Sequence, residues 1–149
     1  MSDNVLKLIP TSPQCTADHE ALKEASELLA RFFPEAGEVT FTSTEQVRFI
    51  DPGQNLERIV CPACGTEVDM AWWQKAMSTA YQTHFTDLSI ELPCCNTSSS
   101  LNQLQYDWPA GFARFVLEVR NPSGRVKTAQ LEQLETILQC SLRQIWAHY

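Results

Sequence analysis

The chain has 149 residues, of which 44% are hydrophobic and 19% charged, and its 18 acidic and 11 basic side chains give a net charge of −7. This composition excludes collagen-like, coiled-coil and disordered proteins, and no apolar run approaches the roughly 18 residues that a membrane-spanning helix requires. The start of the chain lacks the basic and apolar regions of a secretory signal, so we expect a cytoplasmic protein. The length predicts a single domain, residues 1–149.

Charge is distributed unevenly along the chain. Residues 1–60 carry 10 acids and 5 bases, residues 61–110 carry 5 acids and the single base Lys75, and residues 111–149 carry 3 acids and 5 bases. A nucleic-acid-binding protein needs a basic face, because neutralising phosphates supplies most of its affinity. The charge therefore disfavours a nucleic-acid partner, except at the last third of the chain. The bases of that third are Arg114, Arg120, Arg125, Lys127 and Arg143.

The first third of the chain predicts a strand, a helix and two further strands. The apolar run 5–9 is typical of a strand. Thr16 is the expected N-cap of the helix, and Asp18 suits the positive end of the helix dipole. The apolar side chains of the helix recur at spacings of three and four: Leu22, Ala25, Leu28, Leu29 and Phe32. Short alternating runs at 39–42 and 46–50 predict the two strands.

The middle of the chain predicts short elements between cysteines. A strand at 58–60 leads into the first cysteine pair, and a helix begins after Asp69. One face of this helix carries Met70, Trp73, Met77, Tyr81 and His84. An alternating run at 88–92 predicts a strand, the small polar residues 96–100 predict a loop, and residues 106–111 predict an aromatic loop.

The last third repeats the strand–helix–strand order. Residues 113–120 alternate between apolar and charged side chains, Thr128 is the expected cap of a helix, and residues 142–149 form a final strand. Strand–helix–strand units at both ends predict an α+β fold, in which an open sheet carries helices packed on one face. We find no internal sequence repeat.

The sharpest motif is Cys61-Pro62-Ala63-Cys64-Gly65. Two thiolates at this spacing can chelate one tetrahedral ion through a tight turn, and a glycine after the second thiolate allows the positive φ of such a turn. The motif resembles the Cys-Pro-x-Cys-Gly knuckle of zinc-ribbon modules. That resemblance implies a zinc-ribbon-like insert, which we place at residues 58–105.

Cys94 and Cys95 form the second pair, and 29 residues separate it from the first. Here the sequence departs from the ribbon pattern, because a ribbon has a second spaced pair and adjacent side chains of a strand point to opposite faces. In a bend the two side chains can converge. Two interpretations stay open: all four cysteines bind one zinc ion, or His84 replaces one cysteine of the second pair.

The expected zinc site is structural. Four thiolates leave no open position and no histidine or carboxylate ligand, whereas catalytic zinc sites usually have both. We expect backbone N–H groups of the knuckle to donate hydrogen bonds to the sulfurs. A thiol-redox role is disfavoured, because a thioredoxin-like pair opens a helix and the helix here begins only after Asp69. Cys15 and Cys140 are interpreted as packing thiols.

No phosphate-binding glycine-rich loop, His-Glu-x-x-His or Gly-x-Ser-x-Gly motif occurs in the sequence. The whole chain resembles small stand-alone bacterial proteins of uncharacterised function that combine the knuckle with a later Pro-Cys-Cys. We therefore hypothesise a non-enzymatic, zinc-stabilised protein-binding module, such as an immunity or inhibitor protein that neutralises a basic toxin, since acidic faces steer such association. The candidate contact residues are Glu67, Asp69, Glu91, Asp107 and Trp108. The alternatives are a nucleic-acid-linked zinc protein that uses the basic last third, or an enzyme with an unrecognised site near His84.

Overall fold

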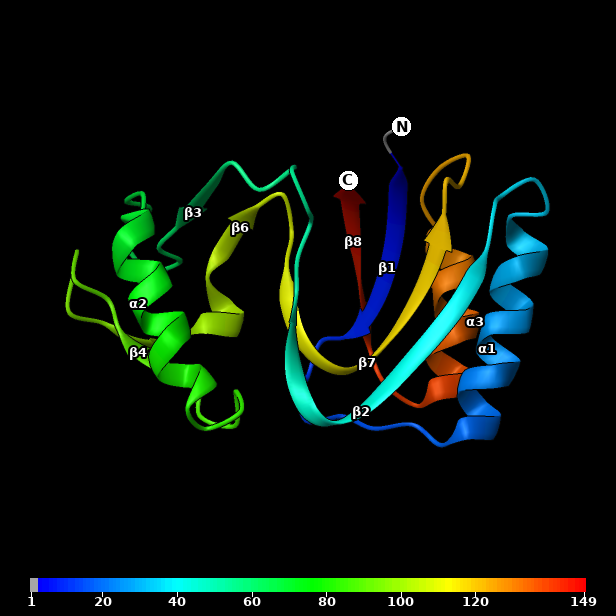
Figure 1. The fold of residues 1–149 in the computed structure, drawn as a ribbon, viewed down its shortest axis with the longest axis horizontal. Helices are drawn as coiled ribbons and strands as arrows, with labels where there is room; N and C mark the ends of the chain where they lie inside the picture. Colours follow the sequence, from blue (N-terminus) through cyan, green and yellow to red (C-terminus); the bar gives the residue numbers. More distant parts are fainter. Residues whose placement is uncertain (1–2) are drawn as a thin grey trace.

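The computed structural model describes residues 3–149 and contains an antiparallel sheet with two helices on one side (Figure 1). Its four strands lie in the order β2-β7-β1-β8 and comprise β1 (Asn4–Pro10), β2 (Val39–Ile50), β7 (Gly111–Arg120) and β8 (Leu142–His148). The helices α1 (His19–Phe32) and α3 (Thr128–Leu138) pack together against this sheet. The predicted α+β class, an open sheet with helices on one face, is confirmed.

Apolar side chains of α1, α3 and the sheet form the core beneath the helices. The residues in it that are at most 1% exposed are Leu6, Leu8, Leu22, Ala25, Leu29, Phe115, Leu117, Val119 and Leu134. The predicted cap of α1 is wrong. Asp18 is the N-cap, and its carboxylate accepts the N–H of Ala21 at 2.7 Å, which satisfies a free donor of the first turn. The predicted cap of α3 is also wrong: Lys127 is its N-cap, and Thr128 is the first residue of the helix.

The two strands predicted at 39–42 and 46–50 are one continuous strand, β2. Its pairing with β7 shifts register between Ser43 and Arg48, where extra residues of β2 bulge out of the ladder. The bulge interrupts the hydrophobic alternation, so the sequence suggests two strands where the backbone makes one.

Between β2 and β7 the chain forms a separate group of small elements, residues 51–110, which we call the cysteine lobe. It lies on the side of the sheet away from α1 and α3 (Figure 1). Its elements are β3 (Arg58–Val60), α2 (Met70–Tyr81), β4 (Ser89–Glu91), β5 (Ser98–Ser100), the 3-10 helix η1 (Leu101–Gln103) and β6 (Gln105–Asp107). β3 pairs with β6, and β4 with β5. The loops predicted at 96–100 and 106–111 thus contain β5 and part of β6.

An aromatic cluster forms the interior of the cysteine lobe. Trp73 is 8% exposed, and its Nε1–H donates to the hydroxyl of Tyr106 at 3.2 Å. That hydroxyl donates in turn to the carbonyl of Leu101 at 2.7 Å. Phe49 of β2 and Phe112 of β7 continue the cluster into the sheet, with ring centroids 5.2 Å apart. Within residues 3–149, none of the helices is both long and apolar enough to cross a membrane.

A buried lysine joins the two ends of the chain to the start of the cysteine lobe. Lys7 is 7% exposed, and its Nζ donates to the carbonyl and Oδ1 oxygens of Asp51, both at 3.0 Å, and to the hydroxyl of Tyr149. The Tyr149 hydroxyl donates to Asp51 Oδ1 at 2.8 Å. Burial opposes both charges, but the hydrogen bonds outweigh it: they raise the pKa of Lys7 and lower that of Asp51. The two groups therefore remain an ion pair.

Candidate metal centre

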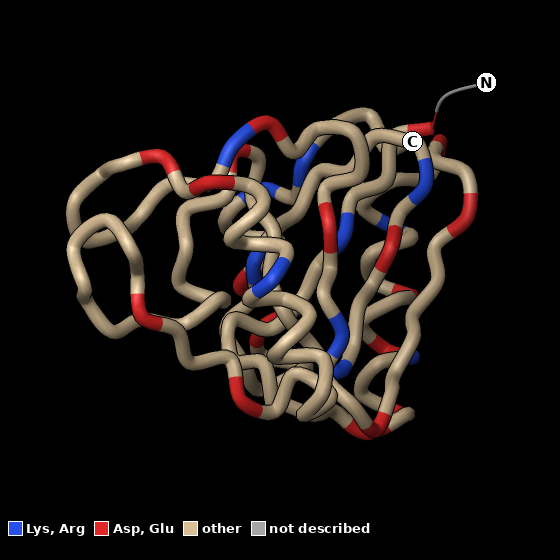
Figure 2. Tube along the Cα trace, turned by 60° about the vertical axis from the view of Figure 1, so that its left-hand side comes forward, with Lys and Arg blue, Asp and Glu red and all other residues tan. Residues whose placement is uncertain are grey.

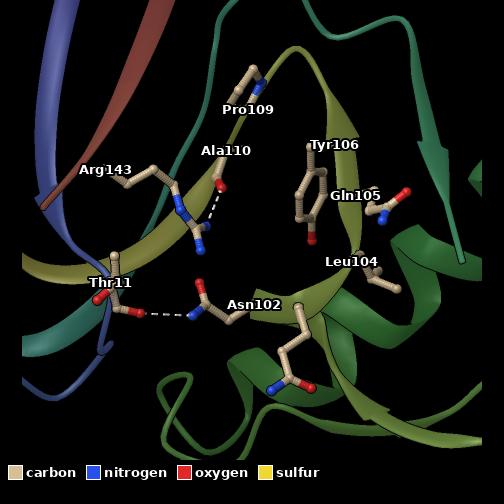
Figure 3. Close-up of a pocket in the computed structure, with 9 residues that line it drawn as sticks. Thr11, Asn102, Leu104, Gln105, Tyr106, Pro109, Ala110 and Arg143 are labelled. Atoms are coloured by element: carbon tan, nitrogen blue, oxygen red, sulfur yellow. Dashed lines mark hydrogen bonds between the residues drawn. The ribbon is translucent and has the colours of Figure 1, made fainter. Parts of the chain in front are cut away.

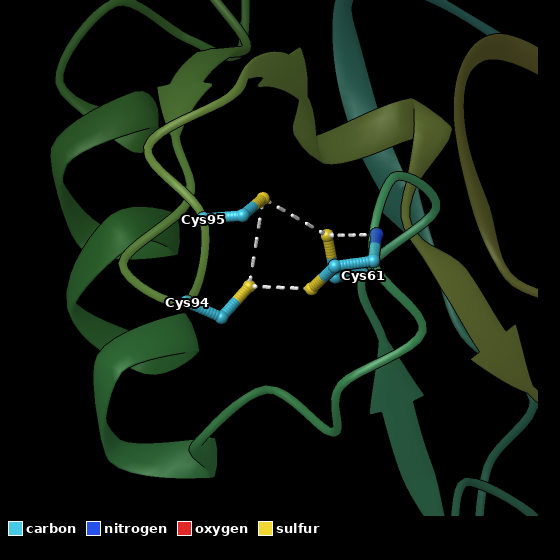
Figure 4. A group of neighbouring side chains, drawn as sticks. Cys61, Cys94 and Cys95 are labelled. Atoms are coloured by element: carbon cyan, nitrogen blue, oxygen red, sulfur yellow. Dashed lines mark hydrogen bonds between the residues drawn. The ribbon is translucent and has the colours of Figure 1, made fainter.

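The four predicted ligand cysteines come together at one edge of the cysteine lobe (Figure 4). The Sγ atoms of Cys61, Cys64, Cys94 and Cys95 all lie within 4.8 Å of one another. Individual sulfur–sulfur distances are 3.8 Å for Cys61–Cys95, 3.9 Å for Cys94–Cys95 and 3.3 Å for Cys64–Cys94. A tetrahedral ion with sulfur ligands at about 2.3 Å requires sulfurs about 3.8 Å apart. Two of these distances match the edge of a tetrahedral site and the third is shorter, so the four sulfurs lie close enough to hold one ion.

The first cysteine pair lies on a tight turn that follows β3. The N–H of Gly65 donates to the carbonyl of Cys61 at 3.0 Å, and the N–H of Cys61 donates to the carbonyl of Thr66 at 2.9 Å. Gly65 has a φ of 77°, which a glycine adopts without steric cost. The N–H groups of Ala63 and Cys64 lie 3.4 and 3.5 Å from Cys61 Sγ. These contacts are the predicted N–H bonds to sulfur, and they orient the first ligand.

The second cysteine pair lies on the same kind of turn, between β4 and β5. The N–H of Asn96 donates to the carbonyl of Leu92 at 2.8 Å, and the N–H of Leu92 donates to the carbonyl of Thr97 at 3.0 Å. Asn96 has a φ of 57°, in the left-handed region that asparagine tolerates better than most residues. Residues 92–97 therefore have the same two backbone hydrogen bonds as residues 61–66, at equivalent positions.

This match reveals a short internal repeat that sequence analysis missed. The two turns read Cys-Pro-Ala-Cys-Gly-Thr and Leu-Pro-Cys-Cys-Asn-Thr. Only Pro, Cys and Thr are identical at equivalent positions, so the similarity becomes recognisable once the hydrogen bonds align the two segments. The repeated Cys-x-Thr ending is the signal that could have found it.

The repeat explains how two adjacent cysteines bring their sulfurs to one cluster. Leu92 occupies the position that Cys61 has in the first turn, and it packs in the lobe core with 0% exposure. The sulfur missing from that position is supplied by Cys94, at the position of Ala63. Because Cys94 and Cys95 lie in a turn, the strand rule that adjacent side chains point to opposite faces does not apply to them.

Two threonines at equivalent positions lie beside the sulfurs. Thr66 Oγ1 lies 3.2 Å from Cys64 Sγ, and Thr97 Oγ1 lies 3.1 Å from Cys95 Sγ. Hydrogen bonding by Thr66 lowers the pKa of Cys64 to about 6, and hydrogen bonding by Thr97 lowers the pKa of Cys95. The hydrogen bond to Cys64 raises the pKa of Cys94 to about 12. Such a cluster favours thiolates at some positions, and a cation that binds all four sulfurs releases the remaining protons.

His84, the alternate ligand, does not belong to this group. It is exposed, follows the C-terminal end of α2 and has a φ of 56°. Its ring lies 6.3 Å from that of Tyr81 in an edge-on arrangement. The helix ends before His84, so the predicted helical face does not extend to it. Among the described residues, the four cysteines form a ligand set without it.

The candidate contact residues fall into two groups. Glu67, Asp69 and Glu91 are exposed on the cysteine lobe, two of them next to the turns that carry the cysteines. Asp107 instead forms an ion pair with Arg58 across β3 and β6, with 3.2 Å between Oδ2 and Nε. The fifth residue, Trp108, is half-buried.

Trp108 follows β6 and lies away from the cysteine turns, at a shallow pocket that Ser123, Arg125 and Trp146 also line. The guanidinium of Arg125 lies 5.9 Å from its ring centroid. A cation at this distance is attracted to the face of the ring. The geometry therefore separates Trp108 from the acidic residues of the lobe.

Cys15 and Cys140 lie elsewhere, half-buried against the core beneath α1 and α3. The fold brings them together, although one precedes α1 and the other follows α3. Burial and the neighbouring Cys15 raise the pKa of Cys140 to about 12, so it remains a neutral thiol. Their packing against apolar side chains agrees with the interpretation that they are packing thiols.

The comparisons with known proteins add no family to this description. A scan against protein-family models, a search of curated proteins and a search of solved structures each gave no match to the chain.

Proposed function

We propose that the four clustered cysteines hold one structural zinc ion. The observation that carries this proposal is the approach of four Sγ atoms to within 4.8 Å of one another, on two turns of the same type. Bound there, zinc supplies a tetrahedral cross-link between the turn after β3 and the turn after β4. Four thiolates complete its coordination, so the ion stabilises the fold and offers no position to a substrate.

We further propose that the chain is a non-enzymatic protein-binding module, of the kind formed by immunity and inhibitor proteins, for a basic partner. Support comes from the net charge of −7 and from exposed acids on the cysteine lobe. Figure 2 shows acidic positions distributed over the lobe, which has few basic ones. A rigid acidic surface steers a basic protein toward it and suppresses binding of acidic ones.

Metal content tests the zinc site. The purified protein is expected to contain one equivalent of zinc, and cobalt substitution is expected to give the absorption of a tetrahedral four-sulfur site. Cys61→Ser and Cys94→Ser lose the metal, whereas Cys15→Ser, a matched change at a half-buried thiol outside the site, retains it. Stoichiometric zinc in Cys61→Ser, or in Cys94→Ser, would contradict the proposed ligand set.

A charge-reversal pair tests the partner surface. One variant replaces Glu67, Asp69 and Glu91 by lysine, and the control replaces three exposed acids of α1 (Glu20, Glu24 and Glu27) by lysine. Both change the net charge equally. A basic partner identified by affinity capture and mass spectrometry should bind the wild type and the control, but not the lobe variant, and its affinity should fall with salt. Equal binding by both variants refutes the lobe surface, and saturable binding of DNA or RNA at low salt would favour the nucleic-acid alternative.

A further inference from the structure

A pocket of about 520 Å³ lies between the sheet and the cysteine lobe, away from the cysteine turns (Figure 3). Its walls come from both parts. Thr11 follows β1 and Arg143 belongs to β8, while Asn102, Gln103 and Gln105 come from the lobe. The volume is in the range of small-molecule sites. The lining consists of polar, apolar and one cationic side chain, with no aspartate or glutamate among the residues that form it.

Arg143 is the cation of this pocket. Its Nη1 donates to the carbonyl of Ala110 at 2.8 Å, and this is the single hydrogen bond that its side chain makes to the described part of the protein. Within residues 3–149, the ion pairs involve Lys7 and Arg58, so no carboxylate neutralises Arg143. A guanidinium has five N–H donors, so most of those of Arg143 are available to water or to a ligand in the pocket that this side chain lines. Burial lowers the pKa of Arg143 from its ordinary value.

The surroundings of Arg143 are rigidly held. Asn102 donates through Nδ2 to the carbonyl of Thr11 at 3.2 Å and accepts a backbone N–H of β7 through Oδ1, also at 3.2 Å. Gly111 leaves the space that this arrangement needs, because a Cβ there would lie 2.7 Å from Ile9 Cδ1 and 3.0 Å from Arg143 Nη1. The guanidinium of Arg143, the amide of Asn102 and the backbone of β7 thus lie close together. They form this pocket in the structure without a ligand.

We propose that this pocket binds a small organic carboxylate, whose charge lies on Arg143 and whose polar body lies against the amides of Gln103 and Gln105. A guanidinium pairs well with a carboxylate, because two parallel N–H donors match its two oxygens. One cation matches the single charge of a carboxylate, whereas a phosphate monoester carries about −1.5 to −2 at pH 7. The proposal concerns different residues from the zinc site and goes beyond the proposed function.

A titration with charge-matched probes tests the proposal. The probes are N-acetyl amino acids, the corresponding N-acetyl amino-acid amides, which lack the charge, and inorganic phosphate. In ¹H–¹⁵N spectra of the full-length protein, at least one acid should cause saturable shifts at the pocket residues, and its amide should not. Arg143→Gln should weaken binding at least about tenfold. Arg125→Gln, which removes an exposed guanidinium outside the pocket, should leave binding unchanged.

Gln105→Ala is a second variant, since its exposed side chain on β6 can be removed without disturbing the core. It should weaken the same acid and keep the spectrum of the folded protein. The proposal is overturned if no acid gives saturable shifts below about 20 mM, if acid and amide bind equally, or if phosphate binds more tightly than every acid. Unchanged affinity in a folded Arg143→Gln or in Gln105→Ala also overturns it. These outcomes do not affect the zinc proposal, because the pocket and the cysteine cluster share no residue.

Discussion

Replacing Gly65 by alanine measures the backbone contribution of the first cysteine turn. Gly65 has a φ of 77°, and a Cβ added to it would meet no atom within 4 Å. The cost of the substitution is therefore conformational, with no steric clash against neighbours. A residue with a Cβ pays about 1–2 kcal/mol in the left-handed region. We expect Gly65→Ala to lower the free energy of unfolding of the zinc-loaded protein by that amount.

Where the turn becomes ordered only when zinc binds, the same free-energy cost should lower the zinc affinity by about 5–30-fold. Denaturant unfolding at fixed free zinc and competition with a chromophoric chelator measure the two quantities. Gly124→Ala is the matched control, because a Cβ there also meets no atom within 4 Å and its φ lies outside the left-handed region. It should be neutral or stabilising by about 0.4–1 kcal/mol. Equal effects of the two substitutions would refute the left-handed turn, as would a loss at Asn96→Gly comparable with that at Gly65→Ala.

Three further predictions concern other parts of the fold. Tyr106→Phe should lower the free energy of unfolding by about 1–3 kcal/mol in denaturant titrations, because it leaves a buried indole N–H and a buried carbonyl without their partner. Asp51→Asn should destabilise by roughly 1 kcal/mol near pH 7, discounted because about half of its side chain is exposed. The pKa of Asp51 is lowered on folding, so its contribution to the free energy of unfolding is present above about pH 4. That contribution is lost as the pH falls through the folded-state pKa, and the difference in stability between wild type and Asp51→Asn should shrink there. Gly53→Ala should lower the melting temperature more than Gly65→Ala, because its Cβ would lie 2.2 Å from the carbonyl oxygen of His148 in addition to a φ of 62°.

The parts of the fold that sequence could predict are those in which burial follows a regular period. α1, α3 and β7 present apolar side chains at helical or strand spacing to the core beneath the helices, and their positions agree with the structure to within a few residues. The paired strands β4 and β5 differ in this respect. β5 consists of three serines, whose strand conformation comes from pairing with β4 and not from any side-chain pattern.

The candidate site likewise has one part that the sequence predicts and another that depends on the folded structure. Cys61 and Cys64 could be identified from their own spacing, because the ligands of one turn are local in sequence. The use of both Cys94 and Cys95 depends on the turn that residues 92–97 adopt, and this turn is fixed by hydrogen bonds and by a left-handed Asn96. The pocket at Arg143 could not be predicted at all, since its walls meet only when β8 and the cysteine lobe come together.

The two cysteine turns also explain why a site at the edge of the lobe is connected to its core. Cys61 is 1% exposed and Leu92 is 0% exposed, and both occupy the first position of their turns. The first residue of each turn belongs to the buried cluster that contains Trp73, and the Sγ atom of Cys61 also lies 3.8 Å from that of Cys95 in the other turn. A cysteine in place of Leu92 would put a second first-position sulfur where an apolar side chain now packs. With the fourth cysteine at position 94, one turn stays anchored by an apolar side chain and four sulfurs still converge, so core packing and the proposed metal binding act on the same two turns.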